Sequence, residues 1–231
     1  MKNFNLVLKM LCLILAILFF VSCPIPVSDN GAGEYYPELG SRAEGSYYSF
    51  GLPTGSYRKI VSYSNGKNIG LNEQSLIGTF GYTYQCVEYV KRFYGTIFKN
   101  GLIPRLPDGM AKNMFSLLSN NESYICMKNN ENKKPNADDI ICFDDKNDPN
   151  SWGHVAIIRE VYDSYIQIIH QNYYCNSADD RTSINYSVID GKYCIENLDN
   201  YSVIGWIRLK SPEYNSNYII SDNKPSVTLN A

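Results

Sequence analysis

The apolar positions in the first half of the folded region repeat with the period of a helix. From Cys86 to Phe98 they share one helical face, and they are Val87, Val90, Phe93, Tyr94 and Ile97. This spacing predicts an amphipathic helix over residues 86–98, which Thr83 can cap. A second, weaker helix is predicted over residues 111–118, after the turn sequence Pro107-Asp108-Gly109.

Further along the chain the period changes to two, which is typical of strands. Short runs rich in β-branched and aromatic residues predict strands over residues 140–143, 154–161, 165–171 and 203–209. Asp163-Ser164 makes a tight connection between the middle pair. Because helices precede strands, we predict an α+β domain whose N-terminal helices pack on one face of an antiparallel sheet.

The N-terminus carries the pattern of an export signal. Lys2 and Lys9 precede an unbroken apolar run, Met10–Val21, which is short for a membrane span. The run ends at Ser22-Cys23 and resembles the bacterial lipoprotein cleavage box, in which the cysteine receives lipid. An uncleaved anchor or an ordinary secretory signal remains as an alternative. We therefore expect an exported protein of the cell envelope, anchored to a bacterial membrane through lipid on Cys23.

This signal sets the expected division of the chain. Residues 1–22 form the signal peptide, and residues 23–46, rich in Gly, Pro, Ser and acidic residues, form a lipidated tether. Residues 47–210 form the catalytic domain, and residues 211–231 form a C-terminal tail. The full chain of 231 residues suits one domain plus a targeting segment.

Composition excludes several classes of partner. Apolar residues make up 44% of the chain and charged residues 19%, so there is enough material for a core. The formal net charge is −2 and the cations are scattered, so we expect no nucleic-acid partner. No metal-binding or phosphate-binding motif is present, and we expect no metal, no cofactor and a monomeric protein.

Four of the seven cysteines lie outside the signal and outside the candidate site described below, and they are Cys126, Cys142, Cys175 and Cys194. An even number in an exported chain permits disulfides in three connectivities. Buried free thiols fit equally well, because Cys142 lies inside the apolar run of residues 140–143.

The candidate nucleophile is Cys86, at the start of the amphipathic helix. Unpaired backbone N–H groups and the positive end of the helix dipole are expected to lower the pKa of its thiol. His154 opens a strand after Ser151-Trp152-Gly153, where its imidazole can serve as the general base. The alternative is a buried structural cysteine, because the spacing of a cysteine and a histidine in the sequence is weak evidence that they act together.

Two segments carry a resemblance to a known family. The sequence from Gly81 to Arg92, centred on Gln85-Cys86-Val87-Glu88, resembles the nucleophile motif of the CHAP family, the cysteine, histidine-dependent amidohydrolases and peptidases. The segment Gly153–Ile158 is similar to the histidine strand of that family. Within the family, the chain is most similar to the amidase domain of glutathionylspermidine synthetase/amidase enzymes.

The resemblance implies a papain-like α+β fold and acyl transfer. Cys86 would attack a carbonyl carbon, and His154 would take the thiol proton and later protonate the leaving amine. Gln85 and the backbone N–H of Cys86 would form the oxyanion hole, although Gln85 can equally be an exposed residue of the first turn.

The third member of the site is open between His170 and Asn172. The family usually has Glu, Asp or Asn here, whereas this chain reads His170-Gln171-Asn172. A neutral histidine cannot offset the charge of an imidazolium, which favours Asn172. Either residue shares a face with His154 only if the hairpin near Asp163 has an odd loop or a bulge.

Three functions fit these residues. The leading hypothesis is a cell-envelope enzyme that cleaves amide or peptide bonds in peptidoglycan. A second is hydrolysis of a small glutathione–polyamine conjugate. A third, suggested by His170, is a lipoprotein that binds wall peptide without catalysis.

Overall fold

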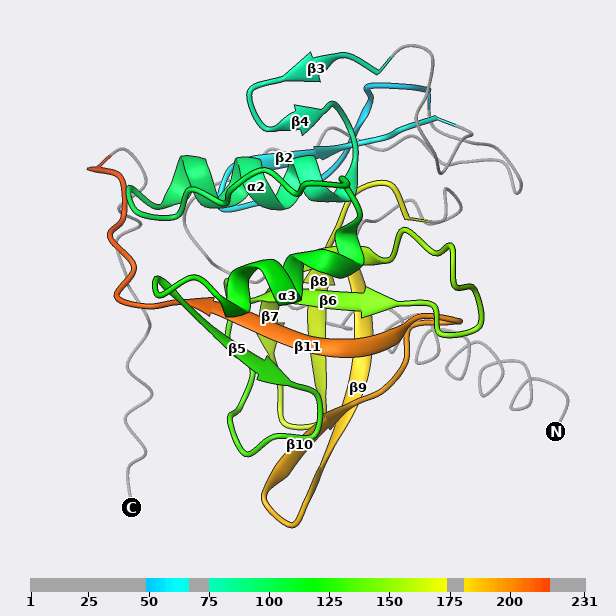
Figure 1. Ribbon diagram of the computed structural model, residues 1–231, viewed down its shortest axis with the longest axis vertical. Helices are drawn as coiled ribbons and strands as arrows, with labels where there is room; N and C mark the ends of the chain where they lie inside the picture. Colours follow the sequence, from blue (N-terminus) through cyan, green and yellow to red (C-terminus); the bar gives the residue numbers. More distant parts are fainter. Residues whose placement is uncertain (1–48, 67–74, 174–180, 217–231) are drawn as a thin grey trace, which may run out of the picture. The chain divides into compact units, whose positions relative to one another are not determined.

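The principal element of the fold is a seven-stranded antiparallel sheet, seen in the computed structural model in Figure 1. The model describes residues 49–66, 75–173 and 181–216, all of which fall within one of the two units of the chain, Glu34–Ala231. The strands are β5 (Tyr124–Lys128), β6 (Ile140–Asp144), β7 (His154–Val161), β8 (Tyr165–Ile169), β9 (Arg181–Ile189), β10 (Lys192–Ile195) and β11 (Ser202–Leu209). Their order across the sheet is β10-β9-β8-β7-β6-β11-β5.

Both faces of the central strands are buried. Along β6, Ile140 and Cys142 belong to one apolar cluster, whereas Ile141 and Phe143 belong to another. This alternation follows from the period of two in a pleated strand. The four strands predicted from the sequence are present, whereas β5, β9 and β10 were not predicted.

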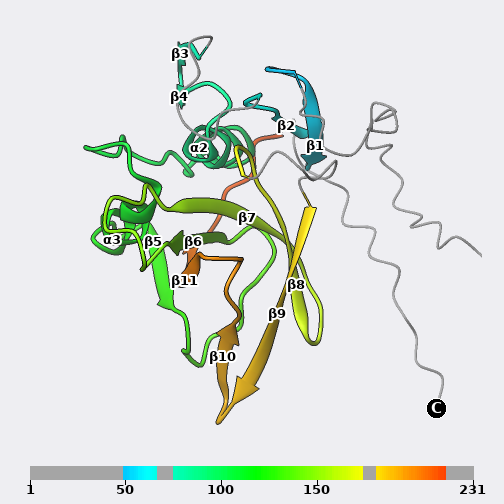
Figure 2. The same ribbon diagram turned by 90° about the vertical axis from the view of Figure 1, so that its right-hand side faces the viewer.

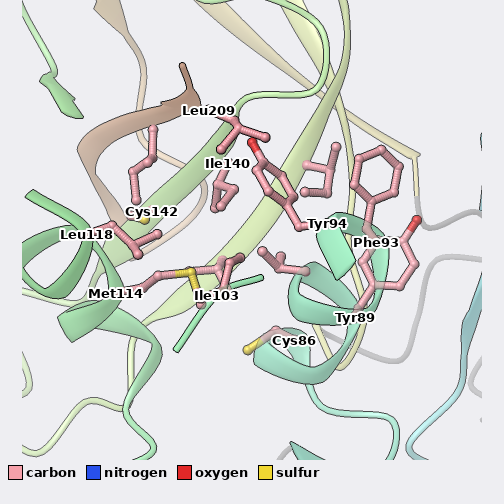
Figure 3. Close-up of a cluster of buried hydrophobic side chains, with 14 of the residues drawn as sticks. Cys86, Tyr89, Phe93, Tyr94, Ile103, Met114, Leu118, Ile140, Cys142 and Leu209 are labelled. Atoms are coloured by element: carbon pink, nitrogen blue, oxygen red, sulfur yellow. The ribbon is translucent and has the colours of Figure 1, made fainter. Parts of the chain in front are cut away.

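The predicted amphipathic helix is α2 (Cys86–Ile97), which ends one residue before the predicted boundary. Its buried residues Tyr89, Val90 and Phe93 join the first cluster, together with Ile140 and Ile157 of the sheet. Figure 3 shows Tyr89, Phe93 and Ile140 of this cluster, with Cys86 in the first turn of the helix. The second predicted helix is a 3-10 turn, η1 (Ala111–Asn113), followed by α3 (Met114–Ser119). The domain thus combines a mainly antiparallel sheet with few helices.

Thr83 does not cap α2, and this prediction was wrong. The N-cap residue is Gln85, which makes no side-chain capping bond. Thr83 instead closes a short hairpin formed by β3 (Ile77–Gly78) and β4 (Gly81–Tyr82). Its Oγ1 accepts a hydrogen bond of 3.0 Å from the backbone N–H of Leu76. A second small hairpin, β1 (Pro53–Tyr57) and β2 (Ile60–Tyr63), appears beside α2 in Figure 2.

The chain continues past the sheet and returns to the end of α2. The backbone N–H of Lys99 donates to the carbonyl of Glu213 at 2.7 Å. The Asn215 amide donates to the carbonyl of Thr96 at 2.6 Å. Residues 211–216, the start of the predicted C-terminal tail, therefore pack on the domain.

Cysteine and membrane predictions are tested only in part by the described residues. Cys86, Cys126, Cys142 and Cys194 are free thiols, and Cys175 lies outside the described residues. No helix among residues 49–66, 75–173 and 181–216 is long and apolar enough to cross a membrane. The signal, the tether and Cys23 lie outside the described residues.

The β7–β8 hairpin contains the irregularity on which the third site residue depends. Ile158 pairs with Ile168, but Glu160 pairs with Gln167, so Arg159 is an extra residue on β7. The connection itself is short, because the N–H of Tyr162 donates to the carbonyl of Tyr165. This bulge shifts the parity by one residue and aligns His170, the first residue after β8, with the face of His154.

Candidate active site

A strained turn places Cys86 at the head of α2. Tyr84, two residues earlier, has a φ of 65°, a left-handed conformation that is uncommon for a residue with a side chain. Its ring is held between Phe50 and Tyr63, at centroid distances of 4.8 and 5.3 Å. The helix then begins with the bond from the N–H of Tyr89 to the carbonyl of Gln85. Packing around Tyr84 therefore fixes where the thiol emerges.

Two opposing effects act on the Cys86 thiol, whose side chain is 9% exposed. Burial raises its pKa to about 11, because the thiolate is poorly solvated. Backbone N–H groups of Val155, Val87 and Cys86 act in the opposite direction on the same pKa. The backbone groups at the start of the helix thus lower the pKa of the thiol, as predicted. The predicted net lowering of this pKa was wrong, because desolvation raises it by more.

His154 follows a loop that is fixed on both sides. Gly153 has a φ of +66°, and a Cβ at this position would lie 2.6 Å from the carbonyl oxygen of Phe143. The N–H of Gly153 donates to the hydroxyl of Ser151 at 3.0 Å, and the N–H of Lys112 donates to the carbonyl of Trp152 at 3.1 Å. Only glycine fits this close approach, so the backbone before His154 is rigidly placed.

The imidazole of His154 is buried and is bonded to a second imidazole. Its Nε2 lies 3.0 Å from Nδ1 of His170, and Nε2 of His170 lies 3.1 Å from Oγ1 of Thr182. Burial lowers the pKa of His170 to about 4. Burial first, and the neighbouring His170 second, hold the pKa of His154 well below its usual range. Both rings are therefore neutral at pH 7.

No direct hydrogen bond joins the thiol of Cys86 and the imidazole of His154 within residues 49–66, 75–173 and 181–216. The sulfur is approached by the N–H of Val155, the residue after His154. Because His170 is bonded to Nε2 of His154, Nδ1 is the ring nitrogen that remains to accept a proton. Catalytic pairs in unliganded enzymes are often long and shorten when substrate binds.

Gln85 and Asn172, predicted as oxyanion donor and third site residue, are bonded to each other. The amide of Asn172 donates to Oε1 of Gln85 at 2.7 Å, and its own oxygen accepts from Asn65 at 3.2 Å. Since Oε1 faces Asn172, the Nε2 group of Gln85 is turned to the other side. The side chain bonded to the ring of His154 is that of His170.

Gln171, between these two residues, binds the first turn of α2. Its side chain is almost fully buried, with 1% exposed. Its amide donates to the carbonyl of Gln85 at 3.0 Å and to the carboxylate of Glu88 at 2.9 Å. Its oxygen accepts from the N–H of Tyr63 at 2.8 Å and from Arg92 at 3.3 Å. The glutamine therefore fixes the start of α2 to the end of β8.

Sequence reasoning assigned no role to Gln171 or Thr182. The contacts of Gln171 join segments about 80 residues apart or more, and no local pattern signals such contacts. Thr182 reaches His170 only because β9 pairs with β8, a strand pairing that was not predicted. Within the described part of the chain, no group of three His, Cys, Asp or Glu side chains could hold a metal ion.

Comparison with known proteins locates this site within a described domain. Residues 77–172 match the family model described as the CHAP domain. Over 101 residues the chain is 35% identical to a trypanothione synthetase of Crithidia fasciculata, covering 40% of this chain and 15% of the synthetase. A solved structure, "The crystal structure of Ly7917 with the hydrolyzing product of MDP", aligns with a TM-score of 0.32 and 17% identity, over 58% of this chain and 56% of that one.

Proposed function

This chain carries a CHAP domain over residues 77–172, and we propose that it is a cell-envelope cysteine hydrolase acting on peptidoglycan. A CHAP domain implies amidase or peptidase activity. The observation that supports a thiol mechanism is the position of Cys86: its sulfur lies at the helix start, beside the backbone that follows His154. The papain-like fold, the lipid anchor on Cys23 and the export are parts of the same proposal.

The first chemical step forms a bond between the Cys86 sulfur and the carbonyl carbon of the substrate. The thiol proton moves to Nδ1 of His154 as the sulfur attacks, because burial keeps the resting thiol protonated. The carbon–nitrogen bond then breaks, and the leaving amine takes that proton. Water hydrolyses the resulting thioester, with His154 as the base. Thiol and imidazole are thus both neutral before attack.

The oxygen of the tetrahedral intermediate needs donors at the helix start. In the proposed site these are the backbone N–H of Cys86 and Nε2 of Gln85. The hydrogen bond from Asn172 to Oε1 of Gln85 supports this role, because it sets which end of the amide is turned away from Asn172. A donor held in place before reaction stabilises the oxyanion without reorganisation.

A second candidate is hydrolysis of a small amide conjugate of a peptide and a polyamine. The 35% identity to a segment of trypanothione synthetase favours it. The expected export signal favours peptidoglycan instead, since a wall substrate lies outside the cytoplasm. Substrate tests separate the two, because both depend on the same thiol.

The deciding experiment incubates the full-length protein with purified sacculi and, separately, with a glutathione–polyamine amide. We expect new amine or peptide ends from sacculi, identified by mass spectrometry, and none after Cys86→Ala. Cys194→Ala is the matched control, since this free, half-buried thiol donates to Asn130 outside the site, and it should retain full activity.

Each outcome has a definite meaning. Product from the conjugate alone would support the second candidate. Release that persists in Cys86→Ala would overturn the thiol mechanism. Binding to sacculi without release by the wild-type protein would indicate a wall-binding lipoprotein that does not cut its ligand.

A further inference from the structure

A chain of two hydrogen bonds leads from the proposed base to the neighbouring strand. Nε2 of His154 lies 3.0 Å from Nδ1 of His170, and Nε2 of His170 lies 3.1 Å from Oγ1 of Thr182. Both rings are almost fully buried, with 3% and 2% exposed, whereas Thr182 is half-buried on β9. The aromatic ring of Tyr173 packs on both imidazoles, at centroid distances of 4.9 Å.

Each link in this chain carries one hydrogen, and so the tautomers of the two rings are coupled. A neutral imidazole has one N–H and one bare nitrogen. If Nε2 of His154 donates, then Nδ1 of His170 accepts, Nε2 of His170 carries its hydrogen and Thr182 must accept. If the direction is reversed, the hydroxyl of Thr182 donates to Nε2 of His170, and His154 carries its hydrogen on Nδ1, the nitrogen that the proposed proton transfer uses.

The reaction therefore requires the first arrangement. When His154 gains the thiol proton it becomes an imidazolium with hydrogens on both nitrogens, and Nδ1 of His170 must then accept. If His170 carried its hydrogen on Nδ1, this N–H would point at the Nε2–H of the His154 imidazolium, and neither group could accept. The hydroxyl of Thr182 satisfies the N–H that this tautomer places on the far side of His170.

We propose that Thr182 is a positioning residue, whose hydroxyl accepts from the Nε2–H of His170 and thereby allows His154 to keep Nδ1 unprotonated, as the proposed proton transfer requires. The kinetic consequence rests on the proposed hydrolase function, whereas the tautomer assignment does not. The hydroxyl supplies one acceptor and takes no proton. It thus compensates in part for the missing carboxylate, because a neutral histidine orients the base only while its own tautomer is fixed.

Thr182→Val is the direct test, because valine keeps the shape and the strand preference but removes the hydroxyl. We expect a roughly tenfold fall in kcat for sacculus hydrolysis, with little change in KM, as for the loss of one buried hydrogen-bond partner. Thr182→Ser restores the oxygen and should recover most of kcat. Ser183→Val, at the neighbouring exposed position, is the matched control and should leave kcat unchanged.

A second readout needs no substrate. The chain has only two histidines, so 15N labelling of histidine gives two assignable rings, and two-bond proton–nitrogen correlations identify each tautomer. At pH 7 we expect both rings neutral, with hydrogens on Nε2, in the wild type and in Thr182→Ser. Thr182→Val should populate the Nδ1–H form of His170.

The two readouts separate two kinds of failure. If Thr182→Val keeps the wild-type tautomers and the wild-type kcat, the inference is wrong while the hydrolase proposal stands. If serine does not restore what valine removes, the effect belongs to packing and the inference is also wrong. If the wild type cuts no amide, the proposed function fails, and the tautomers alone decide the role of Thr182.

Discussion

Two polar networks diverge from neighbouring residues at the end of β8, and they differ in how firmly they hold what they reach. Gln171 makes four hydrogen bonds, to Tyr63, Gln85, Glu88 and Arg92, so the loss of any one leaves three. His170 makes one bond through each ring nitrogen, to His154 and Thr182.

The two networks therefore differ in role: the network of Gln171 supports the start of α2, and the chain through His170 contacts the ring of His154. The network of Gln171 includes a carboxylate and a guanidinium, with Arg92 bonded to Glu88 and to the carbonyl of Val61. It can keep the start of α2 in place at any tautomer or rotamer of the histidines. The chain through His170 holds no formal charge, so its state can change as a proton arrives. A rigid network beside a responsive one would let the proposed base titrate without moving the proposed nucleophile.

Gln171→Leu should have the largest effect, a loss of about 4 kcal/mol in the free energy of unfolding. The leucine fits the volume but leaves the N–H of Tyr63 and the buried carboxylate of Glu88 each short of a partner. Urea denaturation measures the change. Gln167→Leu on the same strand is the control and should stay within about 0.5 kcal/mol, because its half-buried side chain makes no hydrogen bond within the described residues. Equal losses in the two variants would contradict the special role of Gln171.

Acid should destabilise the other network. The pKa of His170 is about 4 in the folded protein and about 6.5 in an unfolded chain, so the unfolded chain binds the extra proton. The free energy of unfolding should therefore fall by about 3 kcal/mol from this group as pH drops from 7 to below 4. His170→Asn should flatten that dependence. Parallel pH curves for variant and wild type, from urea denaturation at each pH, would show that His170 is not held neutral.

Glu88→Gln should have the smallest effect, about 1 kcal/mol. The amide keeps an oxygen for Gln171 but loses the charge that attracts Arg92, whose side chain is 20% exposed and screened by solvent. Thermal unfolding with a denaturant series measures this loss. Glu122→Gln, an exposed position, should change nothing. A loss as large as that of Gln171→Leu would place the carboxylate, and not the amide, at the centre of the network.

Periodic burial made the long elements predictable from the sequence. Apolar residues line one face of α2 and both faces of the first half of β7, because these faces are shielded from solvent. The bounds of the two elements differ by at most one residue from those predicted. Cys86 and His154 could be found because each opens such an element. In β9, Ile184, Tyr186 and Val188 alternate with polar residues, and this period of two was missed.

Long-range features were not predictable for a physical reason. Whether His170 or Gln171 faces His154 depends on the bulge at Arg159, which lies inside an otherwise continuous strand pattern. The pKa of Cys86 depends on how deeply the helix start is buried, which local sequence does not encode. In each case the deciding contact joins segments far apart in the chain.

The bulge at Arg159 also limits how the length of this hairpin can change. Removing one residue there would exchange the two faces for everything that follows on β8, and Gln171 would turn towards the base while His170 turned towards the helix. Insertions or deletions in the arms of the hairpin should therefore preserve the two faces only in even numbers, unless a bulge is gained or lost with them. Relatives that differ in length at this point should differ by two residues, or else carry their polar triplet shifted by one.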